Sequence, residues 1–267
     1  RDGSGAADSF KGTDYADYLA AHPVPSGRDI GVITIAGDIV DGEAPAGTSG
    51  GDTISRIILD AVAQKNLKAL VVRVDSPGGS ALASEKIRQS LLVAKQAKLP
   101  VIVSMGNVAA SGGYWIAAAG DRIFAEPATI TGSIGVFGIV PTFEKTLAKW
   151  GVTADGIGTT PLSGQPDILR GTNAVTDALI QSGVDSTYRR FTQLVASQRR
   201  LPLRRVEEIA QGRVWDGGTA RQIGLVDRFG TLEDAIAEAA RRAKLNPAAV
   251  QPVYLDRMPN WFELYAE

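Results

Sequence analysis

The stretch L-K-A-L-V-V-R-V-D-S-P-G-G-S, residues 67–80, decides the fold that the sequence predicts. Its apolar residues up to Val74 predict a buried strand, and the glycine-rich turn that follows predicts a tight change of direction. A helix is predicted next, over residues 81–98, and another strand over residues 100–105. A parallel pair of strands needs a long connection, and a helix between two strands provides one. The two strands are therefore expected to lie parallel in one sheet. This stretch therefore indicates an α/β fold.

The same alternation of short strands, glycine-rich turns and helices continues along the chain, which predicts largely parallel sheets. Further strands are predicted at residues 30–35, 122–125 and 152–156, with another led by residues 131–136, and further helices at residues 54–62, 142–150 and 173–200.

The composition excludes several classes of function. The net charge of −1 gives no basic field for nucleic acid or for an anionic membrane. The chain has no cysteine, which excludes disulfides, thiolate metal sites and a cysteine nucleophile. No apolar run has the length of a bilayer span. We therefore expect a globular domain with no metal, no cofactor and no nucleic-acid partner.

Two glycine-rich turns carry the candidate chemistry. Ser111 stands in A-S-G-G-Y-W, residues 110–115, where a strand gives way to a predicted helix. The first backbone N–H groups of a helix have no intrahelical partner, so Gly112 could help to hold negative charge beside the serine. Gly78, in the D-S-P-G-G turn, could present a second N–H donor. Taken alone, Ser111 fits better as the N-cap of a buried helix, because serine is a preferred cap residue.

Four motifs together resemble the signal peptide peptidase A (protease IV) family over about residues 28–245: D-S-P-G-G at 75–79, A-S-G-G-Y-W-I-A at 110–117, T-G-S-I-G-V-F-G at 131–138 and G-R-V-W-D-G-x-x-A-x-x-x-G-L-V-D at 212–227.

The resemblance implies a ClpP/crotonase-like fold, a spiral of ββα units, and a serine protease whose base is a lysine. It also implies roles for single residues: Ser111 is the nucleophile, Gly78 and Gly112 are the oxyanion donors, and Ser133 is an accessory residue that orients the lysine. Without the resemblance, Ser133 would be interpreted as a polar turn residue with no catalytic role.

No base for such a Ser/Lys dyad is evident in this chain. The only histidine, His22, precedes a proline in a polar segment, and no lysine lies between Lys149 and Lys244. The family's short form places its lysine in the loop that corresponds to residues 160–167. Arg170 stands near that loop, but a guanidinium stays protonated and cannot act as a base.

The long form of the family, with two homologous halves in tandem, suggests where the base lies. There the lysine belongs to the N-terminal half and the serine to the C-terminal half, and the chain, which begins at Arg1, resembles the latter. The expected organisation is an arm or linker from the preceding half at residues 1–28, a peptidase domain at residues 29–245, and a strand with an apolar tail at residues 246–267.

The resemblance also implies partners and a location. It predicts a homo-oligomer, a tetramer-like ring, that degrades remnant signal peptides and other hydrophobic peptides. It places the parent protein in the bacterial cytoplasmic membrane, with the catalytic domain facing the periplasm. Two alternatives stay open: a crotonase-like enzyme that acts on acyl-CoA, and a non-catalytic structural half of such a peptidase.

Overall fold

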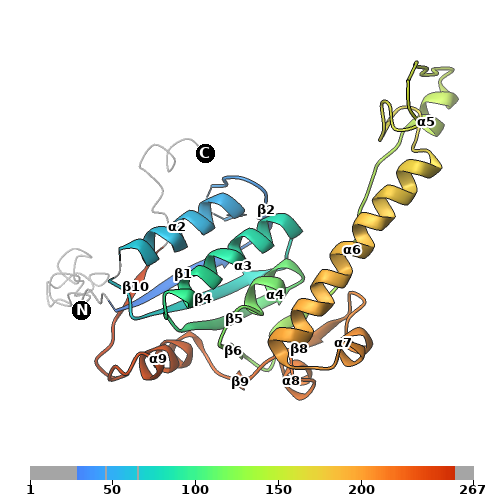
Figure 1. Cartoon of the computed structure of the whole chain (residues 1–267). Coiled ribbons are helices and arrows are strands. Elements are labelled where there is room, and N and C mark those ends of the chain that lie inside the picture. The colour runs from blue at the N-terminus through green and yellow to red at the C-terminus, as the bar shows by residue number, and fades with distance from the viewer. Residues whose placement is uncertain (1–28, 46, 65, 256–267) are drawn as a thin grey trace, which may run out of the picture.

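Helices cover both faces of a mainly parallel sheet (Figure 1). The computed structural model of the chain describes residues 29–45, 47–64 and 66–255. The strands are β1 (Ile30–Ala36), β2 (Ile39–Val40), β3 (Ser49–Gly50), β4 (Ala69–Ser76), β5 (Val101–Ala110), β6 (Arg122–Ala125), β7 (Ile130–Gly132), β8 (Val214–Asp216), β9 (Arg228–Phe229) and β10 (Pro252–Tyr254).

Eight of these strands form one sheet. Its main path runs in the order β10-β1-β4-β5-β6-β9, while β7 pairs with β5 and β8. The pairing of β7 with β8 is antiparallel, and the others in this sheet are parallel. β2 and β3 form a small parallel sheet of their own.

The connections between the strands are mostly helical, as parallel pairing requires. The helices are α2 (Gly51–Ala63), α3 (Ala81–Gln96), α4 (Gly112–Ala117), α5 (Glu144–Lys149), α6 (Ala174–Arg199), α7 (Leu203–Ile209), α8 (Gly217–Gln222) and α9 (Leu232–Arg242).

Side chains on alternate positions of the central strands enter two separate cores. In β1, Ile33 and Ile35 belong to the larger core, which includes residues of α2, α3, α4, α6 and α7. Ile30 and Val32 lie on the other face, in a smaller core that α9 covers. This period of two is what a strand buried on both faces requires.

β5 changes partner along its length, and this change positions the strand's end. Its first part pairs with β6 and its last part with β7. At the break, the Val108 N–H donates a 3.0 Å hydrogen bond to the Asp75 carboxylate. A Cβ on Gly106 would stand 2.6 Å from Asp75 Cγ, so only glycine leaves room there. The register of the β4–β5 pairing shifts here, so that Ala109 lies opposite Ser76, next to the turn that follows β4.

The predicted α/β class is confirmed, with repeating strand-to-helix units β1-β2-β3-α2, β4-α3 and β5-α4. The strand predicted at residues 152–156 is wrong, because this segment is irregular and largely exposed. The N-terminal linker predicted at residues 1–28 lies outside the described residues, and so does the end of the apolar tail, residues 256–267. Within residues 246–255, β10 pairs with β1.

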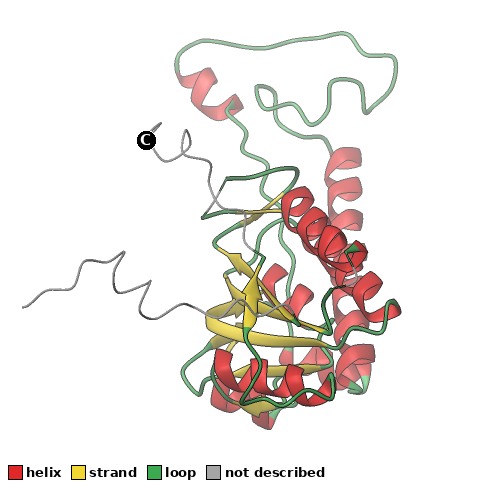
Figure 2. Ribbon diagram, turned by 90° about the vertical axis from the view of Figure 1, so that its left-hand side faces the viewer, coloured by secondary structure: helices red, strands yellow, loops and turns green. Residues whose placement is uncertain are grey.

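Residues 137–175, which we call the arm, project from the domain together with the first turns of α6. Figures 1 and 2 show α5 and its flanking loops beyond the far end of α6. No residue from 137 to 175 is buried, and the Ile157 side chain is fully exposed. None of the helices in the described segments is long and apolar enough to cross a membrane.

Candidate active site

Ser111 occupies a sharp elbow between β5 and α4. Its φ of 50° and ψ of −118° lie in a region that residues other than glycine rarely adopt. The Ser111 N–H donates a 2.9 Å bond to the Gly132 carbonyl oxygen, and the Ser111 carbonyl accepts a 2.9 Å bond from the Trp115 N–H. The side chain makes no capping bond to α4, although the residue stands at the N-cap position. The hydroxyl is therefore not used as a helix cap.

The D-S-P-G-G turn lies directly against this elbow. Gly78 has a φ of 111°, and a Cβ at this position would stand 2.7 Å from both Ser111 Cβ and Gly112 N. Glycine is required here by the backbone conformation and by the close approach. The two turns, far apart in the sequence, thus form one continuous surface beside the Ser111 side chain.

The backbone N–H groups of the two turns differ in their partners. The Gly112 N–H begins α4, where no intrahelical acceptor is available. The Gly78 N–H donates a 3.1 Å bond to Ser76 Oγ. The Gly79 N–H has no recorded acceptor among the described residues, and its nitrogen stands 3.2 Å from where a Cβ on Gly112 would lie. Sequence reasoning missed Gly79 as a candidate donor, although the adjacent glycines of P-G-G indicated it.

The four residues singled out from the sequence meet in one cleft of about 540 Å³. Ser111, Gly78, Gly112 and Ser133 all line it. Ser133 also has a positive φ, of 49°, and its N–H donates a 2.7 Å bond to the Arg213 carbonyl oxygen. The structure therefore brings these residues together, while the role of each stays a prediction.

One side of the cleft is apolar. Trp115 and Phe191 line it with their ring centroids 4.7 Å apart, and Val136 and Phe137 continue the apolar surface toward the arm. Asp38 is the only charged residue among the described residues that line the cleft. An uncharged peptide side chain would fit against this surface better than a charged one.

No lysine or histidine lines the cleft within the described part of the chain. The loop of residues 160–167, where the family's short form carries its lysine, belongs to the arm and lies far from α4 in Figure 1. Lys86 and Lys95 are paired with Asp52 and Asp121 on other parts of the surface. His22 lies outside the described residues. In those described segments no cluster of three or more potential metal ligands occurs.

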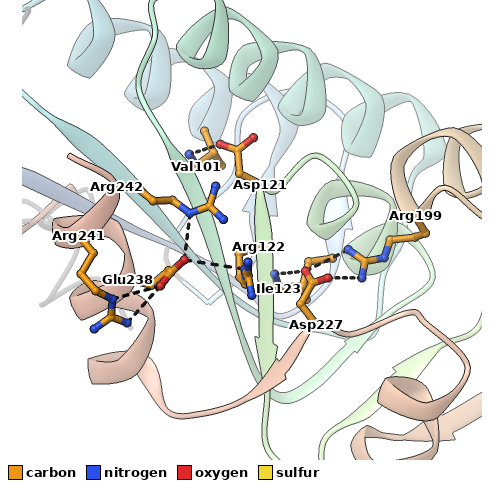
Figure 3. A network of polar contacts seen from close by, with 9 residues as sticks. All are labelled: Val101, Asp121, Arg122, Ile123, Arg199, Asp227, Glu238, Arg241 and Arg242. Carbon is orange, nitrogen blue, oxygen red and sulfur yellow. Dashed lines mark hydrogen bonds and ion pairs between the residues drawn. The ribbon is translucent and has the colours of Figure 1, made fainter. Parts of the chain in front are cut away.

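The G-L-V-D motif of residues 224–227 anchors α4 and α6. The Tyr114 hydroxyl donates a 2.9 Å bond to the Leu225 carbonyl oxygen. The Asp227 carboxylate accepts bonds from Arg199 at 2.6 and 3.1 Å and from the Ile123 N–H at 2.7 Å (Figure 3). Burial acts to raise the pKa of Asp227, but the hydrogen bonds and charge of Arg199 outweigh it and hold the pKa below its usual value.

The chain is similar in sequence to known peptidases. The model of "Peptidase family S49" matches residues 93–246. The chain is 44% identical to Protease 4 of Salmonella typhi, over 89% of this chain and 38% of that protein. It is 44% identical to Protease 4 of Haemophilus influenzae, over 85% of this chain and 36% of that protein.

A third relative is the chloroplastic serine protease SPPA of Arabidopsis thaliana, which is 37% identical over 87% of this chain and 36% of that protein. The chain thus spans a little over a third of the length of these relatives. The family match covers more than half of the chain, including Ser111. The chain belongs to peptidase family S49.

Proposed function

We propose that this chain is the nucleophile-bearing part of a serine peptidase. The observation that carries the proposal is the strained Ser111 elbow, which lies in a cleft against the glycine turn of residues 75–79. Strained backbone of this kind clusters at active sites, where the surrounding structure holds it in place. The protease names of the relatives support the same class of reaction.

In the proposed reaction, Ser111 Oγ attacks the carbonyl carbon of a peptide bond and transfers its proton to a base. The carbonyl oxygen becomes an oxyanion, which the N–H groups of Gly112 and Gly78 stabilise, with Gly79 as a further donor. The tetrahedral intermediate collapses, and the leaving amine takes the proton from the base. Water then hydrolyses the acyl-enzyme and regenerates the serine.

The base in this proposal is a lysine from the N-terminal half of the same protein. Two observations support it: the cleft has neither lysine nor histidine among its described residues, and the chain spans only part of its relatives. A lysine enclosed against the apolar side of the cleft would have a lowered pKa, because burial disfavours the ammonium form. Ser133 would orient its amine.

The proposed substrates are hydrophobic peptides, including remnant signal peptides. An extended peptide would lie along residues 133–136 and pair with the backbone as an added strand. The apolar surface of Trp115 and Phe191 would receive an uncharged side chain. We further propose that the parent protein forms a homo-oligomer, a tetramer-like ring, at the bacterial cytoplasmic membrane, with the cleft facing the periplasm.

The experiment compares the complete protein with the 267-residue chain. The complete protein should cleave an apolar reporter peptide and react with a serine-directed phosphonate at Ser111, as located by mass spectrometry. Ser111→Ala should abolish both. Proteolysis that survives Ser111→Ala would favour a structural half, and acyl-CoA turnover without phosphonate labelling would favour a crotonase-like enzyme. Full-rate cleavage by the isolated chain would contradict a base from the other half.

A further inference from the structure

Glu85 on α3 carries a carboxylate that joins three helices. Its Oε2 accepts 2.7 Å bonds from the Trp115 indole N–H on α4 and from Arg88 Nε. Its Oε1 accepts bonds from Arg88 at 2.9 Å, from Gln89 at 2.6 Å and from Arg190 on α6 at 2.7 Å. The Glu85 side chain is 12% exposed, so these bonds replace most of its contact with water.

Trp115 separates the cleft from the hollow that contains Glu85. The same tryptophan lines the cleft on one side and, on the other, a hollow of about 320 Å³ lined also by Glu85, Arg88 and Arg190. It follows Ser111 by one helical turn and is only 3% exposed. Its position therefore helps to set the width of the cleft next to the nucleophile.

The indole ring needs Glu85 to hold this position. A buried indole N–H requires an acceptor, and the other ring contact of Trp115 is the tilted stacking on Phe191. Arg190 is the residue next to Phe191 along α6, and it bonds the same Glu85 carboxylate. One carboxylate thus constrains both of the helices that supply the two rings.

We propose that Glu85 is a positioning residue that fixes the Trp115–Phe191 wall of the cleft and thereby selects substrates with a bulky apolar side chain at this subsite. The selection of a peptide side chain rests on the proposed peptidase function. Glu85 does not touch the substrate: it acts through Trp115, from the far side of the ring.

The charge of Glu85 agrees with this role. Burial acts to raise its pKa, but the hydrogen bonds from Arg88, Gln89 and Trp115 outweigh burial and lower the pKa to about 2. The group is ionised at neutral pH, and the indole N–H therefore donates to an anion. Charge-assisted bonds of this kind are stronger than bonds between neutral groups.

The test uses the complete protein and two variants that weaken or remove the same bond from opposite ends. Glu85→Gln removes the charge, and Trp115→Phe removes the indole N–H. Gln89→Ala is the matched control, because it removes a different hydrogen bond of the same carboxylate and leaves the charge of Glu85 and the indole N–H in place. The substrates are peptides that differ only in having leucine or alanine at the position facing the wall.

Loss of the indole–carboxylate bond should reduce the preference for leucine over alanine, measured as a ratio of kcat/KM values, by about tenfold in both variants. The change should lie mainly in KM for the leucine peptide, and Gln89→Ala should keep the ratio of the wild-type protein. An unchanged ratio in Glu85→Gln, in a protein whose thermal unfolding is still cooperative, would overturn the inference.

A second readout does not depend on cleavage. In protein labelled with 5-fluorotryptophan, the ¹⁹F signal of Trp115, assigned by its loss in Trp115→Phe, should shift in Glu85→Gln and stay in place in Gln89→Ala. A Trp115 signal that Glu85→Gln leaves unmoved would overturn the positioning role. A wild-type protein that cleaves neither peptide would contradict the proposed function instead, while the fluorine signal would still decide whether Glu85 holds Trp115.

Discussion

Gly78 and Ser111 lie so close together that a Cβ added to Gly78 would stand 2.7 Å from Ser111 Cβ. This contact joins the turn after β4 to the elbow after β5, and neither backbone can move without displacing the other. The same virtual Cβ would also crowd Gly112 N. The proposed nucleophile, Ser111, and the proposed donor, Gly112, therefore depend on the absence of a side chain at position 78.

Gly78→Ala should therefore slow phosphonate labelling of Ser111 by about a hundredfold, because a displacement of about 1 Å at a reacting group has that order of effect. The labelling rate of the complete protein, followed by intact mass, measures this. Gly42→Ala is the matched control, since Gly42 also has a positive φ, of 77°, but open space around it. Equal labelling rates in the two variants would contradict the steric explanation.

The strained elbow predicts a difference in stability between two variants that lack the Ser111 hydroxyl. Ser111→Ala keeps a side chain at φ 50°, whereas Ser111→Gly relieves the strain. We expect Ser111→Gly to have a free energy of unfolding about 1 kcal/mol larger than that of Ser111→Ala, the low end of the cost of such a conformation. Urea unfolding of the two proteins measures the difference. A less stable glycine variant would show that the elbow is not strained.

The Arg199–Asp227 pair should contribute to stability far more than an exposed pair does. Asp227→Ala leaves Arg199, whose side chain is 9% exposed, without its partner, and should lower the free energy of unfolding by about 3 kcal/mol. Glu43→Ala breaks the exposed pair with Arg56 and should cost less than about 1 kcal/mol. Urea unfolding compares them, and equal losses would contradict the importance of burial.

The ionisation of Glu85 predicts an acid-sensitive contribution to stability. Its pKa is lowered from 4.5 to about 2 in the folded protein, so the ionised form favours folding. This contribution is fully present above the unfolded pKa and is lost as the pH falls from 4.5 toward 2. The difference in unfolding free energy between wild type and Glu85→Gln should therefore shrink in this range. A difference that stays constant down to pH 2 would contradict the lowered pKa.

The exposed apolar side chains of the arm provide a test of the proposed oligomer. Trp150→Ser and Ile157→Ser should leave the unfolding temperature unchanged, because both side chains are largely exposed. Both should weaken self-association of the complete protein in analytical ultracentrifugation. Leu82→Ser, at a 71% exposed leucine on α3 outside the arm, is the control and should change neither property. Unaltered association in both arm variants would exclude the arm as the contact.

Much of the fold could be predicted because its signals are local. The apolar run before Asp75 is β4, and the periodicity of residues 173–200 predicted α6 to within a residue at each end. The capping box of α9, formed by Thr231 and Asp234, is equally local. Such features depend on neighbours in the sequence, so a single sequence is sufficient to identify them.

The arm could not be predicted, because apolar residues that stay exposed give the same pattern as core residues. Val152 suggested a strand, yet no strand of the described segments pairs with residues 152–156. The bonds that hold Trp115 could not be predicted either, because Glu85 and Arg190 are separated by 105 residues in the sequence. Nothing local indicates that a glutamate on one helix face meets an indole and a guanidinium from two other helices.

The uninterrupted course of α6 has a mechanical consequence. The helix has 26 residues and is therefore about 39 Å long, with the arm at one end and Phe191 near the other. Phe191 lies in the part of α6 that packs against the domain. A neighbouring molecule that binds the arm would tilt α6 and thereby move the Phe191 ring, which lines the same cleft as Ser111. The arm and the Phe191 side of the cleft are thus two parts of one continuous helix.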